Sequence, residues 1–464
     1  MTITPIFEML ENYRQKRRIS FAMPGHKGGE GLGNRAGVFS MDVTELPDTD
    51  NLYAAGGTAA KAREKAAAFF GAQETFFLTN GATGGIYTML AAVCRRGDKV
   101  LINRGCHGSV INACIMLGLV PVFAEHELIA DFSVLNSVQA SEIAERIDDS
   151  VRAILVTSPN FYGVCADVRK IAEIAHEYGI PLLVDEAHGA HFAADPTLFP
   201  ATALQCGADL VVQSAHKTLN AVNQTAYLHI NSRLVDQERL RDCVQMLHTS
   251  SPSYVMAGFL DSARAELEEP NNWKSVYAAC IRLKDEIVRQ TQIKTLTSAV
   301  NDVFAMDETR VVLNFSAYET TGFAVSDILR TEYNMDIEMA DLYNIVCIVT
   351  AANTTVEIES LGRAVQKIAE KLPPRKTQLL SLGIPRTRAE ILPSQAFDRD
   401  GEWILLNEAA GRTAKRMVTV YPPGIPVLFP GAKITAEAVQ YLYTYREAGG
   451  EIIGMRDDKL YTVK

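Results

Sequence analysis

Short apolar runs alternate with helix-like segments from about residue 59 to residue 230, and this alternation limits the possible folds more than any other feature. An apolar run of about four to eight residues is typical of a buried strand, and strands alternating with helices are typical of a parallel sheet covered on both faces. We expect strands at 75–79, 99–103, 153–157, 181–184 and 209–213, and helices at 84–95, 108–117 and 167–178. The predicted fold class is α/β, with a mostly parallel sheet.

Strand-like and helix-like segments also divide the rest of the chain into predicted domains. Helices are expected to dominate 232–294, and a second α/β unit is expected to follow, with strands at 309–315 and 344–350 and helices at 324–333 and 355–372. Two prolines in KLPPR (371–375) end the helical pattern, so this segment is interpreted as a linker. We predict an N-terminal helix and arm (1–40), a large domain (41–294), a small α/β domain (295–375) and a C-terminal domain (376–464) with a helix near 435–448.

The segment DLVVQSAHKTL (Asp209–Leu219) carries the strongest chemical signal. Its apolar run delivers Ser214, His216 and Lys217 to the end of a strand. A lysine placed there, beside a hydroxyl and an imidazole, can form a Schiff base with an aldehyde cofactor while its neighbours hold the cofactor's phosphate. Most lysines after a strand are solvated surface residues, and the motif is short. It therefore needs support from other segments.

A second apolar strand, Ile180–Val184, runs into Asp185-Glu186-Ala187-His188-Gly189. A buried carboxylate at Asp185 could pair with a pyridinium nitrogen, and the two segments together indicate pyridoxal phosphate (PLP). The letters DEAH also occur in helicases. No GxxxxGK[ST] phosphate loop occurs in this sequence, so the nucleotide interpretation lacks its main support.

Three further strand ends fit the PLP interpretation. In 76–85 (FFLTNGATGG) a glycine-rich turn enters a helix, where free N–H groups and the helix dipole attract an anion, and the Thr83 hydroxyl adds a donor. In 99–109 a strand ends near His107, whose imidazole would lie flat on a pyridine ring. In 153–163 a buried strand ends in a turn that contains proline. In an open α/β sheet, functional residues gather at such carboxyl ends of strands.

With these residues the chain resembles the Orn/Lys/Arg decarboxylase family, PLP enzymes of fold type I with the aminotransferase-like architecture. Seven segments match in the family's order: MPGHKGG (23–29), DVTELP (42–47), NGAT (80–83), CH (106–107), DEAHGAH (185–191), QSAHKTL (213–219) and YPPGIP (421–426) followed by PG (430–431). The resemblance is to the shorter biosynthetic type, which lacks an N-terminal receiver-like domain, and it implies a role in polyamine biosynthesis.

The resemblance implies a role for each matching residue. Lys217 bonds to the cofactor, Asp185 keeps the pyridine nitrogen protonated, His188 lies near the phenolic oxygen and His107 stacks on the ring. Lys217 or His216 handles the proton that replaces CO2. The phosphate contacts are Gly81, Ala82, Thr83, Ser214 and His216. The family also implies a homodimer or a higher homo-oligomer, in which the segments 23–33 and 42–51 reach towards the neighbouring site.

Two departures from the family concern the substrate. Family members usually carry Glu after the Pro-Gly that follows YPPGIP, where this chain has Ala432, and their acidic Asp-Pro-Glu-Gly stretch is replaced within residues 51–57. A buried ammonium or guanidinium without a carboxylate is strongly disfavoured. Either an acid near residues 42–50 supplies the charge or the substrate is not a standard basic amino acid. The candidate substrate-binding residues are Glu45, Asp48 and Asp50.

The predicted function is PLP-dependent decarboxylation of arginine, lysine or ornithine to the amine and CO2. One alternative is a PLP-dependent aminotransferase or lyase acting on another amino acid, since one fold hosts all of these reactions. A second is a non-catalytic relative that uses the fold for binding. The retained Lys217, Asp185 and Thr83 argue against it, because binding alone needs no Schiff-base lysine.

Composition excludes several other classes of protein. The net charge of −10 argues against nucleic acid or an anionic membrane as a partner. The eight cysteines are scattered without a CxxC pair, so neither a disulfide framework nor a metal site is expected, and a reducing cytoplasm fits. The N-terminus lacks the apolar core of a signal peptide, and the most apolar stretch, 111–124, is too short to span a bilayer. We expect a cytoplasmic enzyme.

Overall fold

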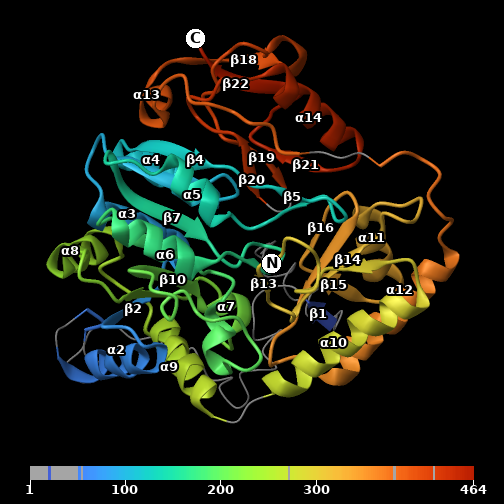
Figure 1. The fold of residues 1–464 in the computed structure, drawn as a ribbon, viewed down its shortest axis with the longest axis horizontal. Helices are drawn as coiled ribbons and strands as arrows, with labels where there is room; N and C mark the ends of the chain where they lie inside the picture. The colour runs from blue at the N-terminus through green and yellow to red at the C-terminus, as the bar shows by residue number, and fades with distance from the viewer. Residues whose placement is uncertain (1–18, 22–50, 54–55, 270–271, 380–382, 422–423) are drawn as a thin grey trace, which may run out of the picture.

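A seven-stranded sheet forms the centre of the molecule (Figure 1). The computed structural model describes residues 19–21, 51–53, 56–269, 272–379, 383–421 and 424–464. In spatial order the strands are β2 (Glu74–Leu78), β11 (Ala226–Ile230), β10 (Leu210–Ser214), β9 (Leu182–Asp185), β7 (Val151–Thr157), β3 (Lys99–Asn103) and β4 (Val120–Ala124). Only β11 runs against the other six, so the predicted mostly parallel sheet is confirmed.

Helices cover both faces of this sheet, as predicted. One face packs against α3 (Gly81–Val93), α4 (Gly108–Leu117) and α8 (Gln237–Leu247), and the other against α2 (Gly57–Phe70), α5 (Ala140–Arg146), α6 (Val168–Glu177) and α9 (Tyr254–Glu268). Neighbouring residues of one strand pack on opposite faces of the sheet. In β10, Val211 lies in the core formed with α2, α5, α6 and α9, and Val212 lies in the core formed with α3, α4 and α8. Because successive side chains of a strand point to opposite faces, an entirely apolar strand is what a doubly covered sheet requires.

A smaller four-stranded sheet packs beside the first, in the order β12 (Lys294–Thr295), β14 (Arg310–Asn314), β17 (Asn344–Ile348) and β16 (Met339–Ala340). Its pairs are antiparallel. The helices α10 (Trp273–Gln290), α11 (Gly322–Glu332) and α12 (Thr355–Lys371) share a core with it. Short pairs join distant parts of the chain: β1 (Ile19–Phe21) with β15 (Met335–Ile337), and β8 (Val164–Cys165) with β13 (Ala305–Met306).

The C-terminal part of the chain, red in Figure 1, lies over the β4 edge of the central sheet, where α13 (Pro393–Asp398) contacts α4. It contains the pair β18 (Gly401–Leu405) and β22 (Lys459–Val463), the sheet β20 (Ile425–Leu428), β19 (Val418–Tyr421) and β21 (Glu451–Ile453), and the helix α14 (Ala436–Glu447). The buried Arg104, directly after β3, donates from Nη1 to the Pro426 carbonyl and from Nη2 to the Val427 carbonyl, both at 2.9 Å. These bonds tie β20 to the central sheet.

The predicted elements agree with the structure to within a few residues at each end, from the strand predicted at 75–79 (β2) to the helix near 435–448 (α14). Within the central sheet the strands β4 and β11 were not predicted, and neither was the helix α2 that packs on it. β4 (VPVFA) carries a proline, which lowers the strand signal but is tolerated at the sheet's edge. The expected N-terminal amphipathic helix lies outside the described residues, and the four-domain division stays a prediction.

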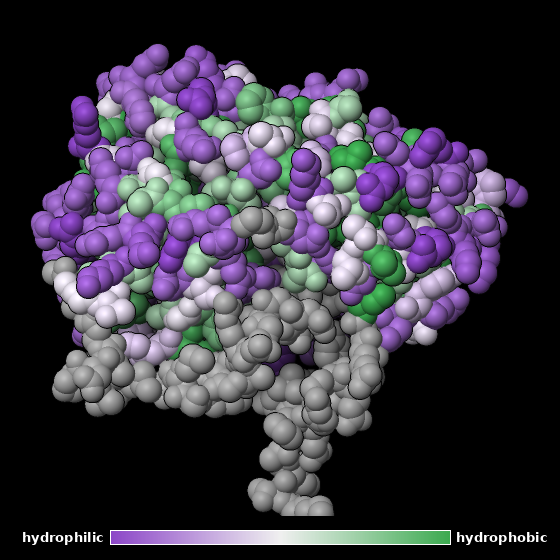
Figure 2. Space-filling view, turned by 90° about the horizontal axis from the view of Figure 1, so that it is seen from below, coloured by the Kyte–Doolittle hydropathy of each residue, from purple (hydrophilic) through white to green (hydrophobic). Residues whose placement is uncertain are grey.

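Polar and charged side chains dominate the outer parts of the face seen in Figure 2, and apolar side chains occur there in small groups. Within the part of the chain that the structure describes, no helix has the length and apolar character needed to cross a bilayer.

Candidate active site

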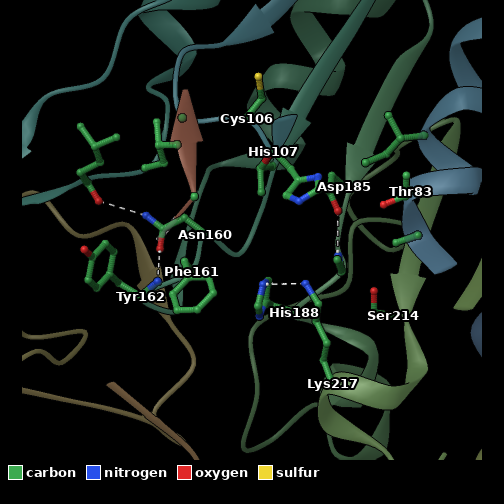
Figure 3. A pocket seen from close by; sticks show the side chains of 18 of the residues that line it. Thr83, Cys106, His107, Asn160, Phe161, Tyr162, Asp185, His188, Ser214 and Lys217 are labelled. Carbon is green, nitrogen blue, oxygen red and sulfur yellow. Dashed lines mark hydrogen bonds between the residues drawn. The ribbon is translucent and has the colours of Figure 1, made fainter. Parts of the chain in front are cut away.

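A cavity of about 340 Å³ lies at the carboxyl ends of the central strands (Figure 3). Five strand ends contribute to its wall, and the sequence motifs place functional residue types at all five. The wall contains residues 81–83 after β2, residues 105–107 after β3, Thr157 and residues 160–162 at the end of β7, Asp185, Ala187 and His188 at the end of β9, and Ser214, His216 and Lys217 at the end of β10. Parallel strands bring these ends to one edge of the sheet although they are far apart in sequence. The cofactor-contacting residues predicted from the sequence all line this one cavity.

Lys217 and His188 are in direct contact at the centre of the cavity. Lys217 Nζ lies 3.0 Å from His188 Nε2, and Arg310 Nη2 lies 3.3 Å from His188 Nδ1. The arginine can only donate, so Nδ1 accepts and the imidazole proton is on Nε2. Burial, together with the charges of Lys217 and Arg310, keeps the pKa of His188 well below its usual range. In this tautomer the neutral ring directs its Nε2–H at the Lys217 nitrogen.

Burial also lowers the pKa of Lys217, with Asp185 opposing the shift and Arg310 adding to it. An amine reacts with an aldehyde only in its uncharged form, so this environment prepares Lys217 for Schiff-base formation. Arg310 was not identified from the sequence. It begins β14 in the smaller sheet, and nothing near it in sequence carries a motif.

Replacing Arg310 by methionine is expected to move the pH profile of cofactor capture by Lys217 to higher pH, by roughly half a unit or more. Loss of the positive charge raises the pKa of Lys217, so the free amine is reached only at higher pH. The rate of PLP uptake by the cofactor-free protein, followed by absorbance across pH, measures this shift. Arg310→Lys keeps the charge and should retain the parent profile. An unshifted profile in Arg310→Met would show that Arg310 does not act on Lys217.

The two neighbouring carboxylates of the DEAH segment point in different directions. Asp185, the last residue of β9, lines the cavity, and its Oδ1 accepts from the Ala187 N–H at 3.1 Å. Glu186 is turned away and accepts from the Ala203 N–H and from Gln213 Nε2, both at 2.7 Å. Alternation at the strand end thus gives Asp185 to the site and Glu186 to the interior.

The first turn of α3 forms a concave surface suited to an anion. Asn80 precedes the helix without capping it by its side chain, and the first turn contains no acidic residue. Gly81 has a φ of +74°, a left-handed conformation that favours glycine. A Cβ on Gly85 would lie 2.4 Å from Val212 Cγ2, so glycine is needed for α3 to pack this closely on β10. The N–H groups of this turn can therefore face a phosphate.

Ser214 and His216 lie on the other side of this anion site. Ser214 ends β10, and His216 belongs to the single turn α7 (Ala215–Thr218). His216 Nδ1 donates to the Thr225 carbonyl at 3.0 Å, which fixes the ring orientation. Both residues line the cavity together with Thr83, so they have the positions that phosphate contacts require.

His107 is the N-cap of α4, and its ring remains accessible because it faces the cavity. Its Nδ1 accepts from the Ser109 N–H at 3.2 Å and lies 2.8 Å from the Ser109 hydroxyl. Burial lowers the pKa of His107, with Asp185 opposing this and Lys217 adding to it. The capping bonds hold a neutral imidazole at the cavity, as a ring-stacking role requires.

A further wall of the cavity was predicted only as a turn after β7. Asn160, Phe161 and Tyr162 project there, on the opposite side from Thr83 and Ser214 (Figure 3). Asn160 Nδ2 donates to the Leu135 carbonyl at 3.0 Å, and the Phe161 ring packs edge-on against His188 with centroids 5.1 Å apart. The SPNFYG sequence is the signal that could have identified this wall.

The substrate candidates Glu45, Asp48 and Asp50 lie outside the described residues, so they stay predictions. Ala432 is fully buried beside Phe429 in the core of the central sheet, and it is not part of the cavity wall. No cluster of three or more potential metal ligands occurs within the described ranges.

This fold, with a lysine and a carboxylate lining one cavity from adjacent strand ends, defines an enzyme of PLP fold type I, which confirms the predicted class. Residues 4–316 match the family described as Orn/Lys/Arg decarboxylase, major domain, and residues 386–458 match its C-terminal domain. The chain belongs to this family. It is an amino-acid decarboxylase, as predicted from the sequence.

Relatives of similar length support the assignment. The chain is 31% identical over 481 residues to an arginine decarboxylase of Bacillus subtilis, covering 99% of this chain and 97% of that protein. It is 32% identical over 488 residues to an arginine decarboxylase of Bacillus anthracis, with the same coverage of both chains. The prediction of a decarboxylase acting on basic amino acids is consistent with these relatives.

Solved structures show the same fold. The lysine decarboxylase of Francisella novicida superposes with a TM-score of 0.77 at 17% identity, over 99% of this chain and 81% of that one. The constitutive lysine decarboxylase of Escherichia coli gives 0.74 at 19% identity, over 100% and 82%. A structure described as SPT with PLP gives 0.58 at 14% identity, over 76% and 87%.

Proposed function

We propose that this protein decarboxylates a basic amino acid, arginine first among the three predicted, with PLP bound covalently at Lys217. The observation that carries the proposal is the contact between Lys217 and the neutral His188 in a cavity that Asp185 also lines. The arginine decarboxylases at 31% and 32% identity support arginine as the substrate.

The residues present fit the cofactor. The first turn of α3, with Ser214 and His216, offers donors to a phosphate at one end of the cavity, and Lys217 offers a free amine to an aldehyde. Asp185 supplies the buried negative charge that stabilises a protonated ring nitrogen. His107 would lie against the ring face. These groups come from four different strand ends. A protein that only binds a ligand would not need all of them.

PLP held by these residues would supply an acceptor for the electron pair left when the bond between Cα and the carboxylate breaks. Asp185 keeps the ring cationic and so favours that electron flow. The phosphate contacts and His107 would hold the cofactor in one position, so that a substrate bonded to it presents a single bond at Cα for breaking. His188 donates its Nε2 proton at the Lys217 nitrogen. Lys217 or His216 then delivers a proton to Cα in place of CO2.

Purified enzyme supplied with PLP is expected to release CO2 and agmatine from arginine in equal amounts. Lysine and ornithine are the comparison substrates, with release of cadaverine or putrescine measured in the same assay. The alternative, an aminotransferase, would form a 2-oxo acid and leave the carboxylate in place. Formation of a 2-oxo acid without CO2 would therefore contradict the proposal.

Assembly into a homodimer or higher homo-oligomer, with the 23–33 and 42–51 segments reaching the neighbouring site, remains a prediction because these segments lie outside the described residues. A cytoplasmic location is likewise proposed from composition.

A further inference from the structure

A second chamber of about 60 Å³ adjoins the catalytic cavity. The walls of both spaces include Leu135, Tyr162 and Ile425, so the two meet at these residues. Figure 3 shows Tyr162 on the side of the cavity away from Thr83 and Ser214. The chamber therefore extends the site at the end opposite the phosphate-binding surface, where the far end of a substrate side chain would lie.

The chamber contains one buried carboxylate, Asp341, which is 9% exposed. Its Oδ1 accepts from the backbone N–H groups of Tyr343 and Asn344, at 2.9 and 2.8 Å, and from the Asn344 side-chain amide at 2.9 Å. Its Oδ2 accepts from the Tyr162 hydroxyl at 2.9 Å and from the same Asn344 amide at 3.1 Å. All of these donors are neutral. Across the described ranges, Asp341 forms no ion pair with Lys, Arg or His within 4.0 Å.

A buried carboxylate without a cation is costly, and proteins usually pair it. Burial raises the pKa of Asp341, with its hydrogen bonds opposing the shift, and raises the pKa of Tyr162 well above its usual range. The chamber thus contains a buried carboxyl group that only neutral groups of the described chain contact. A bound cation would form the ion pair that this carboxyl group lacks within the described chain.

Tyr162 connects this charge to the catalytic cavity. Its hydroxyl hydrogen is used in the bond to Asp341, so the oxygen keeps lone pairs that can accept from a donor in the cavity. The rings of Tyr343, Tyr441 and Tyr445 line the rest of the chamber, and the last two are stacked with centroids 6.1 Å apart. Aromatic faces attract planar guanidinium groups.

We propose that Tyr162 and Asp341 bind the distal guanidinium of the substrate, with the Tyr162 oxygen and Asp341 Oδ2 as acceptors. The inference rests on the proposed function for the identity of the substrate. It supplies, from within the same chain, the carboxylate that Ala432 does not provide.

The test compares arginine with citrulline, whose side chain has nearly the same shape but no charge. In Asp341→Asn, kcat/KM for arginine should fall about 30-fold or more, the range expected for a lost hydrogen bond to a charge. The value for citrulline should stay unchanged or rise. General damage to the site would instead lower kcat/KM for arginine and for citrulline together. The variant should take up PLP as the parent does.

Asp336→Asn is the matched control. Asp336 is also buried and lies five positions earlier in the same region, but it pairs with Arg330 and lines neither space. Its substitution should leave the ratio of arginine to citrulline unchanged. If Asp341→Asn does not fold, Tyr162→Phe carries the test, with an expected loss of about tenfold for arginine alone.

Calorimetry on the cofactor-free protein separates this inference from the proposed function. Agmatine should bind the parent more tightly than N-carbamoylputrescine, in which an uncharged ureido group replaces the guanidinium, and Asp341→Asn should remove the difference. If agmatine shows this pattern but no basic amino acid is decarboxylated, the cation site stands and the proposed function fails. If the variants keep the parent's preference for agmatine and for arginine, the inference is overturned.

Discussion

Lys217→Ala is expected to abolish covalent cofactor attachment and to lower turnover by roughly 10²- to 10⁴-fold, the contribution of a positioned proton-transfer group. Lys217 is the amine in contact with the neutral His188, and its own pKa is lowered by burial, so it is the lysine prepared to react. The parent should be yellow and should lose its visible band on borohydride reduction, and peptide mapping should then find the pyridoxyl group on Lys217.

Two further variants define the cause of the loss. Lys217→Arg keeps a long basic side chain but cannot form the bond, so it should be as inactive as Lys217→Ala. Lys367→Ala removes an exposed lysine of α12 and should behave like the parent. A pyridoxyl group found on another lysine would reject the assignment.

Asp185→Asn is expected to bind PLP but to lower turnover on the order of 100-fold or more, because a neutral amide no longer favours the protonated ring nitrogen. Asp185 is the carboxylate of the DEAH segment that lines the cavity. Measurement of kcat in enzyme with full cofactor content separates this effect from loss of binding.

Glu186→Gln is the matched control for Asp185→Asn. It makes the same chemical change one position later, where the side chain bonds to Ala203 and Gln213 instead of facing the cavity. Its expected cost is in stability, with kcat close to that of the parent. Equal losses of kcat in the two variants would mean that the ring-nitrogen role of Asp185 is wrong.

The elements of the central sheet were largely predictable because their signals are local. Strand β10 is an apolar run and α6 has apolar residues at helical spacing, and each pattern is complete within a window of about ten residues. β11 was missed although AYLHI is entirely buried, since a histidine and a tyrosine interrupt the aliphatic pattern. His229 is satisfied there by Thr75 and Gln213, partners from β2 and β10 that no local window contains.

The residues of the candidate site were likewise predictable where the sequence signal is local. Lys217, Asp185, His107 and the first turn of α3 were predicted because each motif stands at the end of its own strand, and parallel strands end at one edge of a sheet. The sequence analysis assigned Asp185 to the cofactor but gave Glu186 no place, because its direction depends on which face of the strand end meets the cavity.

By itself the sequence determined the fold class and the family, and it predicted the residues that line the central cavity, since periodicity and residue type at strand ends are properties of short segments. Only the tertiary structure decided which charges act on that centre. Arg310 contacts His188 across 122 positions, and Asp341 contacts Tyr162 across 179. Such pairs form where two sheets pack together, and their energies depend on burial and distance, which exist only once the chain has folded.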